Sequence, residues 1–149
     1  MYLGLENYIK SLSLPNTELW VCTNGELLNN ERLIKLHEAG LRNIWYSFFY
    51  TNELDYRKYV RSDSFSTIKN NLYNLISKSD LFDRIKIVTF SRCAEQIEKI
   101  ISGKRKVYLQ KERKNNYGLG MEYLVEGLFV YQLMGMFVSI GKIIILKAR

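Results

Sequence analysis

Four polar side chains lie at or after the ends of predicted strands, where parallel α/β proteins carry their chemistry. Thr23 ends the apolar run 18–23 and Asn24 follows it, Ser47 lies in the aromatic run 43–49, and Arg61 follows a short predicted helical turn. Polar side chains at such positions are candidates for binding a ligand, and Ser47 and Arg61 are among them. The alternative interpretation is an ordinary strand serine and a solvated arginine.

The chain contains few residues that could support thiol or imidazole chemistry. Cys22 and Cys93 are the only cysteines and His37 is the only histidine, so no zinc-binding spacing exists. Cys22 lies inside a predicted strand, which favours a buried apolar role, and Cys93 follows Arg92 without a partner thiol. The first residues lack a basic segment followed by an apolar one, so no secretory signal is predicted. We therefore expect a cytoplasmic protein with reduced cysteines and no metal site.

The elements that must position these residues alternate between strand and helix. Continuous apolar runs predict strands, a periodicity near 3.6 predicts helices, and Gly25 and Gly40 mark turns. The predicted strands are 18–23, 43–49 and 84–90, and the predicted helices are 5–12, 30–39, 64–77 and 94–101, with a helical turn at 55–60. Such alternation implies parallel strands joined by right-handed crossovers. We therefore predict a partial (β/α) barrel of about three βα units in residues 1–102, with open sheet edges.

Residues 103–149 differ in composition from the rest of the chain. They hold nine Lys or Arg against three acids, and therefore most of the formal net charge of +7. We expect 103–117 to be a basic linker, either a solvated loop or a short strand, and nucleic-acid binding is not favoured because no known motif accompanies it. The apolar stretch 127–146 is expected to form a membrane anchor, two strands joined near Gly135, or a buried core segment. A shift of reading frame after about residue 91 is a further interpretation of this tail.

The order of several short motifs resembles the middle of a radical S-adenosylmethionine (radical SAM) enzyme, of the type that carries a C-terminal cluster domain. Its third strand ends in Thr-Asn-Gly, similar to Thr23-Asn24-Gly25, and its next helix ends in Ala-Gly-Leu, similar to residues 39–41. A serine on the fourth strand is matched by Ser47, and a Tyr-then-Arg pattern by Arg61 with Tyr56 or Tyr59. A Ser-Phe helix start is matched by residues 64–65. The resemblance covers about half of the chain.

This resemblance implies cofactor contacts, and the chain also departs from the family. In such enzymes Thr23, Asn24, Ser47 and Arg61 would correspond to S-adenosylmethionine contacts, with the serine and arginine on its carboxylate. The family's Cys-x₃-Cys-x₂-Cys triplet, which supplies three thiolates to a four-iron four-sulfur cluster, is absent, as is its Gly-Gly-Glu-Pro stretch. Relatives often have Ser-Leu/Ile-Asp-Gly where this chain has Ser47-Phe-Phe-Tyr50. The chain thus resembles a barrel that begins just after its catalytic motif.

Three functions follow as hypotheses. The first is a truncated or degenerate radical SAM-like protein. By itself this chain is expected to bind no cofactor and to catalyse no reaction. Complete members of the parent family use S-adenosylmethionine and an iron–sulfur cluster for radical chemistry on a peptide or small molecule. The second is a small basic binding protein, whose open sheet edge or tail would dock on a protein partner. The third is a membrane-associated protein anchored by 127–146.

Overall fold

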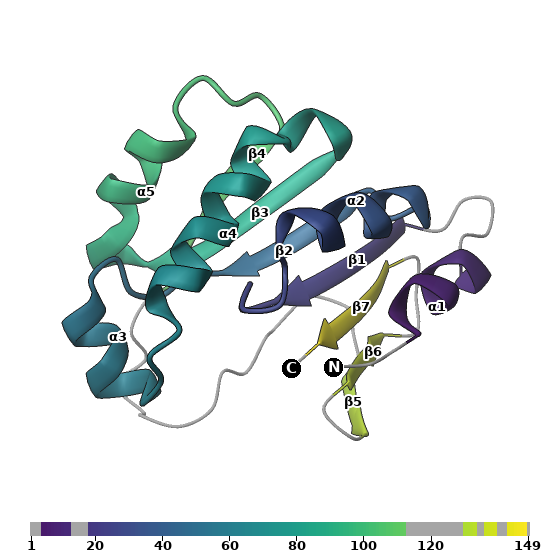
Figure 1. Ribbon diagram of the computed structural model, residues 1–149, viewed down its shortest axis with the longest axis horizontal. Helices are drawn as coiled ribbons and strands as arrows, with labels where there is room; N and C mark the ends of the chain where they lie inside the picture. The colour runs from purple at the N-terminus through teal and green to yellow at the C-terminus, as the bar shows by residue number, and fades with distance from the viewer. Residues whose placement is uncertain (1–3, 13–17, 113–129, 134–135, 140–142, 149) are drawn as a thin grey trace.

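The computed structural model describes residues 4–12, 18–112, 130–133, 136–139 and 143–148, which alternate between helices and strands (Figure 1). The helices are α1 (Leu5–Leu12), α2 (Asn30–Glu38), α3 (Glu53–Val60), α4 (Phe65–Ser77) and α5 (Ala94–Ile101), with short 3₁₀ turns η1 (Ser79–Leu81) and η2 (Ser91–Cys93). The strands are β1 (Glu18–Thr23), β2 (Asn43–Ser47), β3 (Arg84–Phe90), β4 (Val107–Glu112), β5 (Val130–Leu133), β6 (Met136–Ser139) and β7 (Ile143–Ala148).

Local signals in the sequence account for the helix ends. The Asn29 side chain caps α2 by accepting a hydrogen bond from the Arg32 amide, and Gly40 follows the helix with a positive φ. Asn52 caps α3 in the same way, by accepting from the amide of Asp55. Ser64 precedes α4 as predicted, but its side chain makes no capping hydrogen bond there.

A five-stranded sheet in the order β4-β3-β2-β1-β7 forms the centre of the molecule, and every pairing in it is parallel. Strands β1 to β4 are neighbours in chain order, with α2 between the first two, α3 and α4 between the next two, and α5 before the last. The prediction of parallel strands interleaved with helices is therefore confirmed. The described strands form an open sheet, with β4 and β7 at its edges.

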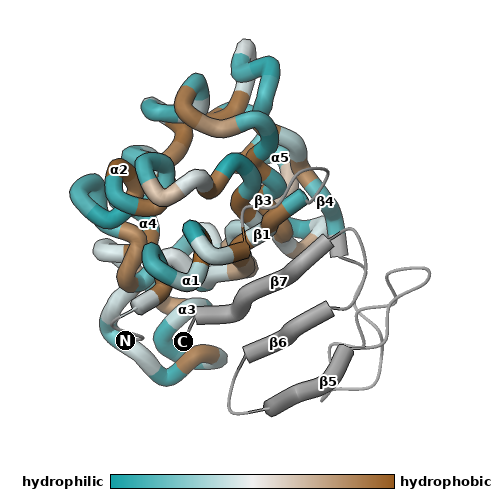
Figure 2. The backbone as a smooth tube through the Cα atoms, turned by 90° about the vertical axis from the view of Figure 1, so that its right-hand side faces the viewer, coloured by the Kyte–Doolittle hydropathy of each residue, from teal (hydrophilic) through white to brown (hydrophobic). Residues whose placement is uncertain are grey.

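The main core lies on one face of this sheet. Residues of α1, α2, α4 and α5, together with Tyr56 of α3, form a single apolar cluster with the strands. Ile9 of α1, Leu33 of α2, Leu72 of α4 and Ile97 of α5 are fully buried in it. Figure 1 shows α2 and α4 lying across the strands, and Figure 2 shows α1, α2 and α4 on the same side of β1 and β3. Because all these helices cover one face, the crossovers share one hand, which parallel sheets almost always make right-handed.

Side chains that alternate with the core residues form a smaller cluster on the opposite face. Trp20, Trp45 and Val88 are buried there, with Cys22 and Phe49 packed against them. Cations lie over both indole rings, because Arg84 is 5.8 Å from the Trp20 ring and the Lys86 amine is 4.6 Å from the Trp45 ring. This face thus carries aromatic and cationic side chains, and none of the described helices belongs to its cluster.

The segment that was expected to be an irregular tail contributes strands instead. β4 lies in its basic part and pairs with β3, which agrees with the short-strand interpretation of 103–117. β7 comes from its last residues and pairs with β1, while β5 and β6 pair antiparallel. The described part of 127–146 is therefore extended, as in the prediction of two strands. Among the helices that the structure describes, none has the length and apolar character needed to cross a bilayer.

Candidate functional site

The turn after β1 brings two of the predicted site residues together, and its backbone uses their side chains. The Gly25 amide donates to Thr23 Oγ1 over 3.0 Å, and the Glu26 amide donates to Asn24 Oδ1 over 3.2 Å. Thr23 is buried and Asn24 is exposed. Both side chains therefore hold the turn in shape, as Thr and Asn commonly do in tight turns.

Gly25 has no room for a side chain in this turn. Its φ is +85°, and a Cβ atom built on it would lie 1.8 Å from the Tyr46 hydroxyl oxygen. Asn71 of α4 fastens the same turn, because its side-chain amide donates to the carbonyls of Gly25 (2.8 Å) and Glu26 (3.2 Å). Tyr46 is itself fixed, since its hydroxyl donates to the Ile68 carbonyl over 2.7 Å. The Thr-Asn-Gly motif is thus locked onto β2 and α4.

Burial has a clear electrostatic effect on Tyr46. Its side chain is fully buried, and desolvation of the phenolate, with a smaller contribution from Tyr56, raises the pKa of the Tyr46 hydroxyl far above its usual value. The hydroxyl group therefore stays protonated and acts as a hydrogen-bond donor. Its role is to hold β2 against α4.

Ser47 ends β2 on the face opposite the helices. The preceding Tyr46 belongs to the helix-side core, and side chains alternate between faces along a strand. Ser47 pairs in register with Val88 of β3 and is half-buried. Its hydroxyl therefore lies near the carboxyl end of the sheet on the face that carries Trp45.

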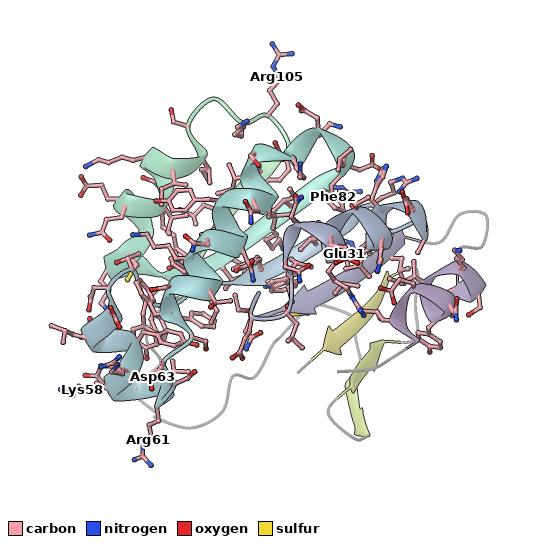
Figure 3. The ribbon with its side chains drawn as sticks, viewed as in Figure 1. Glu31, Lys58, Arg61, Asp63, Phe82 and Arg105 are labelled. Atoms are coloured by element: carbon pink, nitrogen blue, oxygen red, sulfur yellow. The ribbon has the colours of Figure 1, made fainter. Side chains whose placement is uncertain are left out.

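Arg61 lies at the end of α3 and is exposed. Figure 3 shows its side chain pointing away from the sheet, as does that of Lys58. Its φ is 58°, and its amide donates to the Arg57 carbonyl over 3.1 Å, which is a left-handed helix cap. The structure therefore brings Thr23 and Asn24 together and leaves Arg61 apart from Ser47.

This backbone conformation makes a prediction for Arg61. We expect Arg61→Gly to raise the free energy of unfolding by about 0.5–1 kcal/mol, because glycine adopts positive φ without the steric cost that a Cβ atom brings. Urea denaturation followed by circular dichroism measures this change. The control is Arg57→Gly in the middle of α3, which we expect to destabilise. A loss of stability on Arg61→Gly would show that the arginine side chain makes a contact that matters.

A group of rings and cations at the carboxyl ends of β2 and β3 was not predicted from the sequence. We call it the aromatic–cation cluster, and it consists of Tyr50, Tyr59, Phe90, Lys58 and Arg92. The rings of Tyr50 and Tyr59 stack with centroids 5.5 Å apart and an interplanar angle of 9°, and Phe90 meets Tyr50 edge-on at 5.6 Å. The Arg92 guanidinium lies 5.4 Å from both the Tyr50 and Phe90 rings, and the Lys58 amine lies 5.2 Å from the Tyr59 ring.

The members of this cluster differ in exposure. Tyr50 is half-buried, whereas Tyr59 leaves 55% of its surface exposed, and Arg92 and Lys58 are exposed as well. Burial raises the pKa of the Tyr50 hydroxyl despite the opposing effect of the Arg92 charge, so the phenol stays neutral. The sequence offered one signal for this site, because aromatic residues directly follow or end the strands β2 and β3.

The residues present do not fit an iron–sulfur cluster. Such a cluster takes three thiolates in the family that the sequence resembles, and this chain has two cysteines. Cys22 packs against the Trp20 and Trp45 cluster, whereas Cys93 is buried and its thiol donates to the Phe49 carbonyl over 3.4 Å. Within the part of the chain that the structure describes, no group of three or more His, Cys, Asp or Glu side chains is placed to hold a metal ion.

His37 has a structural environment. Its ring meets Phe82 edge-on with centroids 5.9 Å apart, and its Nδ1 atom lies 3.1 Å from the Arg42 guanidinium. The same guanidinium donates to the His37 carbonyl over 2.8 Å. These contacts tie the end of α2 to the strand that follows.

The chain was compared with known protein families, with characterised proteins and with solved structures. None of the three comparisons found a match.

Proposed function

We propose that the chain is the arc of a radical SAM-like (β/α) barrel that performs no radical chemistry by itself. The observation that carries this proposal is the sheet order, in which β1, β2, β3 and β4 follow one another in parallel with the helices of the core on one face. A (β/α) barrel has this arrangement, because its helices form an outer ring around strands that are neighbours in chain order. A doubly wound sheet would instead carry helices on both faces.

In this proposal the face opposite the helices corresponds to the interior of the barrel. Barrel interiors are filled by large side chains from neighbouring strands, as Trp20, Trp45 and Val88 fill this face. Ser47 lies on the same face at the carboxyl end of β2, where the family resemblance expects the serine that meets the S-adenosylmethionine carboxylate. The Thr23–Asn24 turn lies at the same end of β1. Arg61, which points away, does not join this arrangement.

In this proposal the chain performs no radical chemistry because it has too few thiols. The family cleaves S-adenosylmethionine with an electron from a cluster held by three thiolates, and Cys22 and Cys93 cannot supply three. β4 forms one edge of the described sheet, and β6 lies beside β7 at the other edge (Figure 2). In this proposal the chain serves as a scaffold whose β4 edge pairs with a further strand, since natural proteins usually cover such edges.

Anaerobic reconstitution tests the absence of chemistry. The purified chain is incubated with ferrous iron and sulfide, desalted and analysed for bound iron, then given dithionite and S-adenosylmethionine. We expect no iron beyond that retained by a Cys22→Ser/Cys93→Ser control, and no 5′-deoxyadenosine. Iron retained only by the unmodified chain, together with formation of 5′-deoxyadenosine, would contradict the proposal.

The genomic DNA upstream of the Met1 codon tests the family relationship separately. A Cys-x₃-Cys-x₂-Cys sequence encoded there, followed by a Gly-Gly-Glu-Pro stretch, would support the assignment to a radical SAM barrel. An upstream sequence that encodes no such triplet in any frame would count against it.

A further inference from the structure

The turn after β1 contains Asn24–Gly25, which is the one Asn-Gly pair in the sequence. In such a pair the backbone nitrogen of glycine can attack the side-chain Cγ atom of asparagine, because no side chain on the glycine hinders the approach. A bond forms between this nitrogen and Cγ, the bond from Cγ to Nδ2 breaks, and the glycine amide proton leaves with the side-chain nitrogen as ammonia. Water then opens the resulting succinimide at either carbonyl, which leaves aspartate or isoaspartate.

The surroundings of Asn24 allow this reaction, whereas those of the Gly25 amide oppose it. Asn24 is exposed, so water reaches its side chain and ammonia can leave. Gly25 is buried, and its amide donates to Thr23 Oγ1 over 3.0 Å. The nitrogen attacks only after a base has taken its proton, and solvent does not reach a buried proton that is held in a hydrogen bond. The Thr23 hydroxyl thus keeps the nucleophile inactive while the turn is closed.

The remaining groups of the turn are held as well. Asn24 Oδ1 accepts from the Glu26 amide over 3.2 Å, which restricts rotation of the side chain. The Gly25 carbonyl accepts from the Asn71 side chain over 2.8 Å and from the Leu28 amide over 3.1 Å. Ring closure makes the bonds between Asn24 and Gly25 part of a planar ring, so the backbone must rotate. These hydrogen bonds cannot all persist during that rotation, and the turn must therefore open first.

We propose that Asn24 is a site of spontaneous deamidation, and that the reaction proceeds only when the turn opens. Thr23 and Asn71 control its rate, because one accepts from the Gly25 amide and the other donates to the Gly25 carbonyl. The co-reactant is water alone. The inference rests on the geometry of the turn and is independent of the proposed function.

The two products have different effects on the fold. Aspartate keeps an oxygen that can accept from the Glu26 amide. Isoaspartate lengthens the backbone before Gly25 by a methylene group, although the Tyr46 ring leaves no space beside Gly25. Both products place a negative charge at the carboxyl end of β1, where parallel α/β proteins bind ligands. Deamidation therefore changes the charge of this strand end and, in the isoaspartate form, its shape.

Mass spectrometry of proteolytic peptides measures the reaction. The full chain is incubated at neutral pH in water enriched in heavy oxygen, which labels the new carboxyl group and separates it from deamidation during digestion. We expect Asn24 to react at least about tenfold more slowly in the folded chain than in the same chain unfolded in urea, because opening breaks hydrogen bonds of the turn. Below the unfolding transition the rate should stay nearly independent of urea, since a local opening exposes little surface.

Two substitutions test which residues control the rate. Thr23→Val removes the oxygen that holds the Gly25 amide, and Asn71→Ala removes the side-chain donor to the Gly25 carbonyl. Each should raise the rate at Asn24 in the folded chain about tenfold, which is the effect expected of losing one buried hydrogen bond. Neither should change the rate in urea, where the turn is absent.

Matched variants exclude a general loss of stability as the cause. Thr89→Val replaces a buried threonine of β3 whose hydroxyl has no hydrogen-bond partner among the described residues, and Asn70→Ala replaces an exposed asparagine next to Asn71. Neither should change the rate at Asn24 more than about twofold, since neither touches the turn. Asn24→Gln should abolish the signal, because the longer side chain closes its larger ring far more slowly.

Equal rates in the folded and the unfolded chain would overturn the proposal, since the turn would then offer no protection. Unchanged rates in both Thr23→Val and Asn71→Ala would overturn it as well. A rate that rises steeply with urea from the lowest concentrations would show that Asn24 reacts through global unfolding, which also contradicts the proposal.

Discussion

Gly25→Ala is expected to lower the free energy of unfolding by about 2–5 kcal/mol. Two costs add. The left-handed backbone at Gly25 disfavours any Cβ atom by about 1–2 kcal/mol. The new methyl group would also lie 1.8 Å from the Tyr46 hydroxyl oxygen and 2.0 Å from the ring carbon that bears it. Overpacking of this kind costs about 1–3 kcal/mol.

Moving the Tyr46 ring away from the new methyl group would itself cost free energy. It is fully buried, and its hydroxyl is held by the Ile68 carbonyl. Chemical denaturation of Gly25→Ala and Gly103→Ala side by side separates the two costs. Gly103 has a similar φ of +77° but nothing within 4 Å of the added Cβ atom, so it reports the backbone cost alone. Equal destabilisation of the two variants would show that the turn gives way without strain.

The same contact bears on the meaning of the Thr-Asn-Gly motif. In the family that the sequence resembles, this motif marks a functional strand end. In this structure the amides and carbonyls of Gly25 and Glu26 are engaged internally, through the Thr23, Asn24 and Asn71 side chains. The motif is therefore explained by the packing of the turn against Tyr46 and by its hydrogen bonds with Asn71.

The local elements could be predicted closely because their signals are local. The helix expected at 30–39 is α2, Asn30–Glu38, whose start is set by Asn29 and whose end is followed by Gly40. The strand expected at 43–49 ends at Ser47, two residues early, although the Phe48 amide still donates to the Val88 carbonyl over 2.8 Å. Apolar periodicity and caps carry this information over a few residues.

The placement of the tail could not be predicted in the same way. β7 pairs with β1 in full register, from Glu18 opposite Ile143 to Thr23 opposite Ala148, across more than 100 residues of sequence. Nothing in the run 143–148 identifies its partner strand, since several apolar strands would suit it equally. β4 was easier to predict as a strand than β7 was to place. Val107 and Leu109 alternate with Tyr108 and Gln110, which is a strand pattern within a basic segment.

The candidate site was partly predictable for a related reason. Thr23 and Asn24 adjoin in sequence, so their proximity needs no tertiary information. The approach of Tyr59 to Tyr50 and of Arg92 to Phe90 depends on how α3 and η2 leave the strand ends. Arg61, which the family resemblance suggested as a ligand contact, lies in a left-handed helix cap, a backbone conformation that its position in the sequence did not predict. Residue type and order indicated the end of the sheet that carries the site, but not the side chains that meet there.

Asn71→Ala is expected to destabilise the protein by about 2–3 kcal/mol relative to Asn70→Ala. The buried Asn71 amide donates to the carbonyls of Gly25 and Glu26, and alanine would leave these groups short of a donor and open a cavity between α4 and the turn. Asn70 is the matched control, because it is exposed on the same helix and gains the same helix propensity on replacement. Urea denaturation of both variants gives the difference. If Asn71→Ala matched Asn70→Ala, the hydrogen bonds from α4 to the turn would contribute nothing to stability, and the turn would depend on its own hydrogen bonds and on packing against Tyr46.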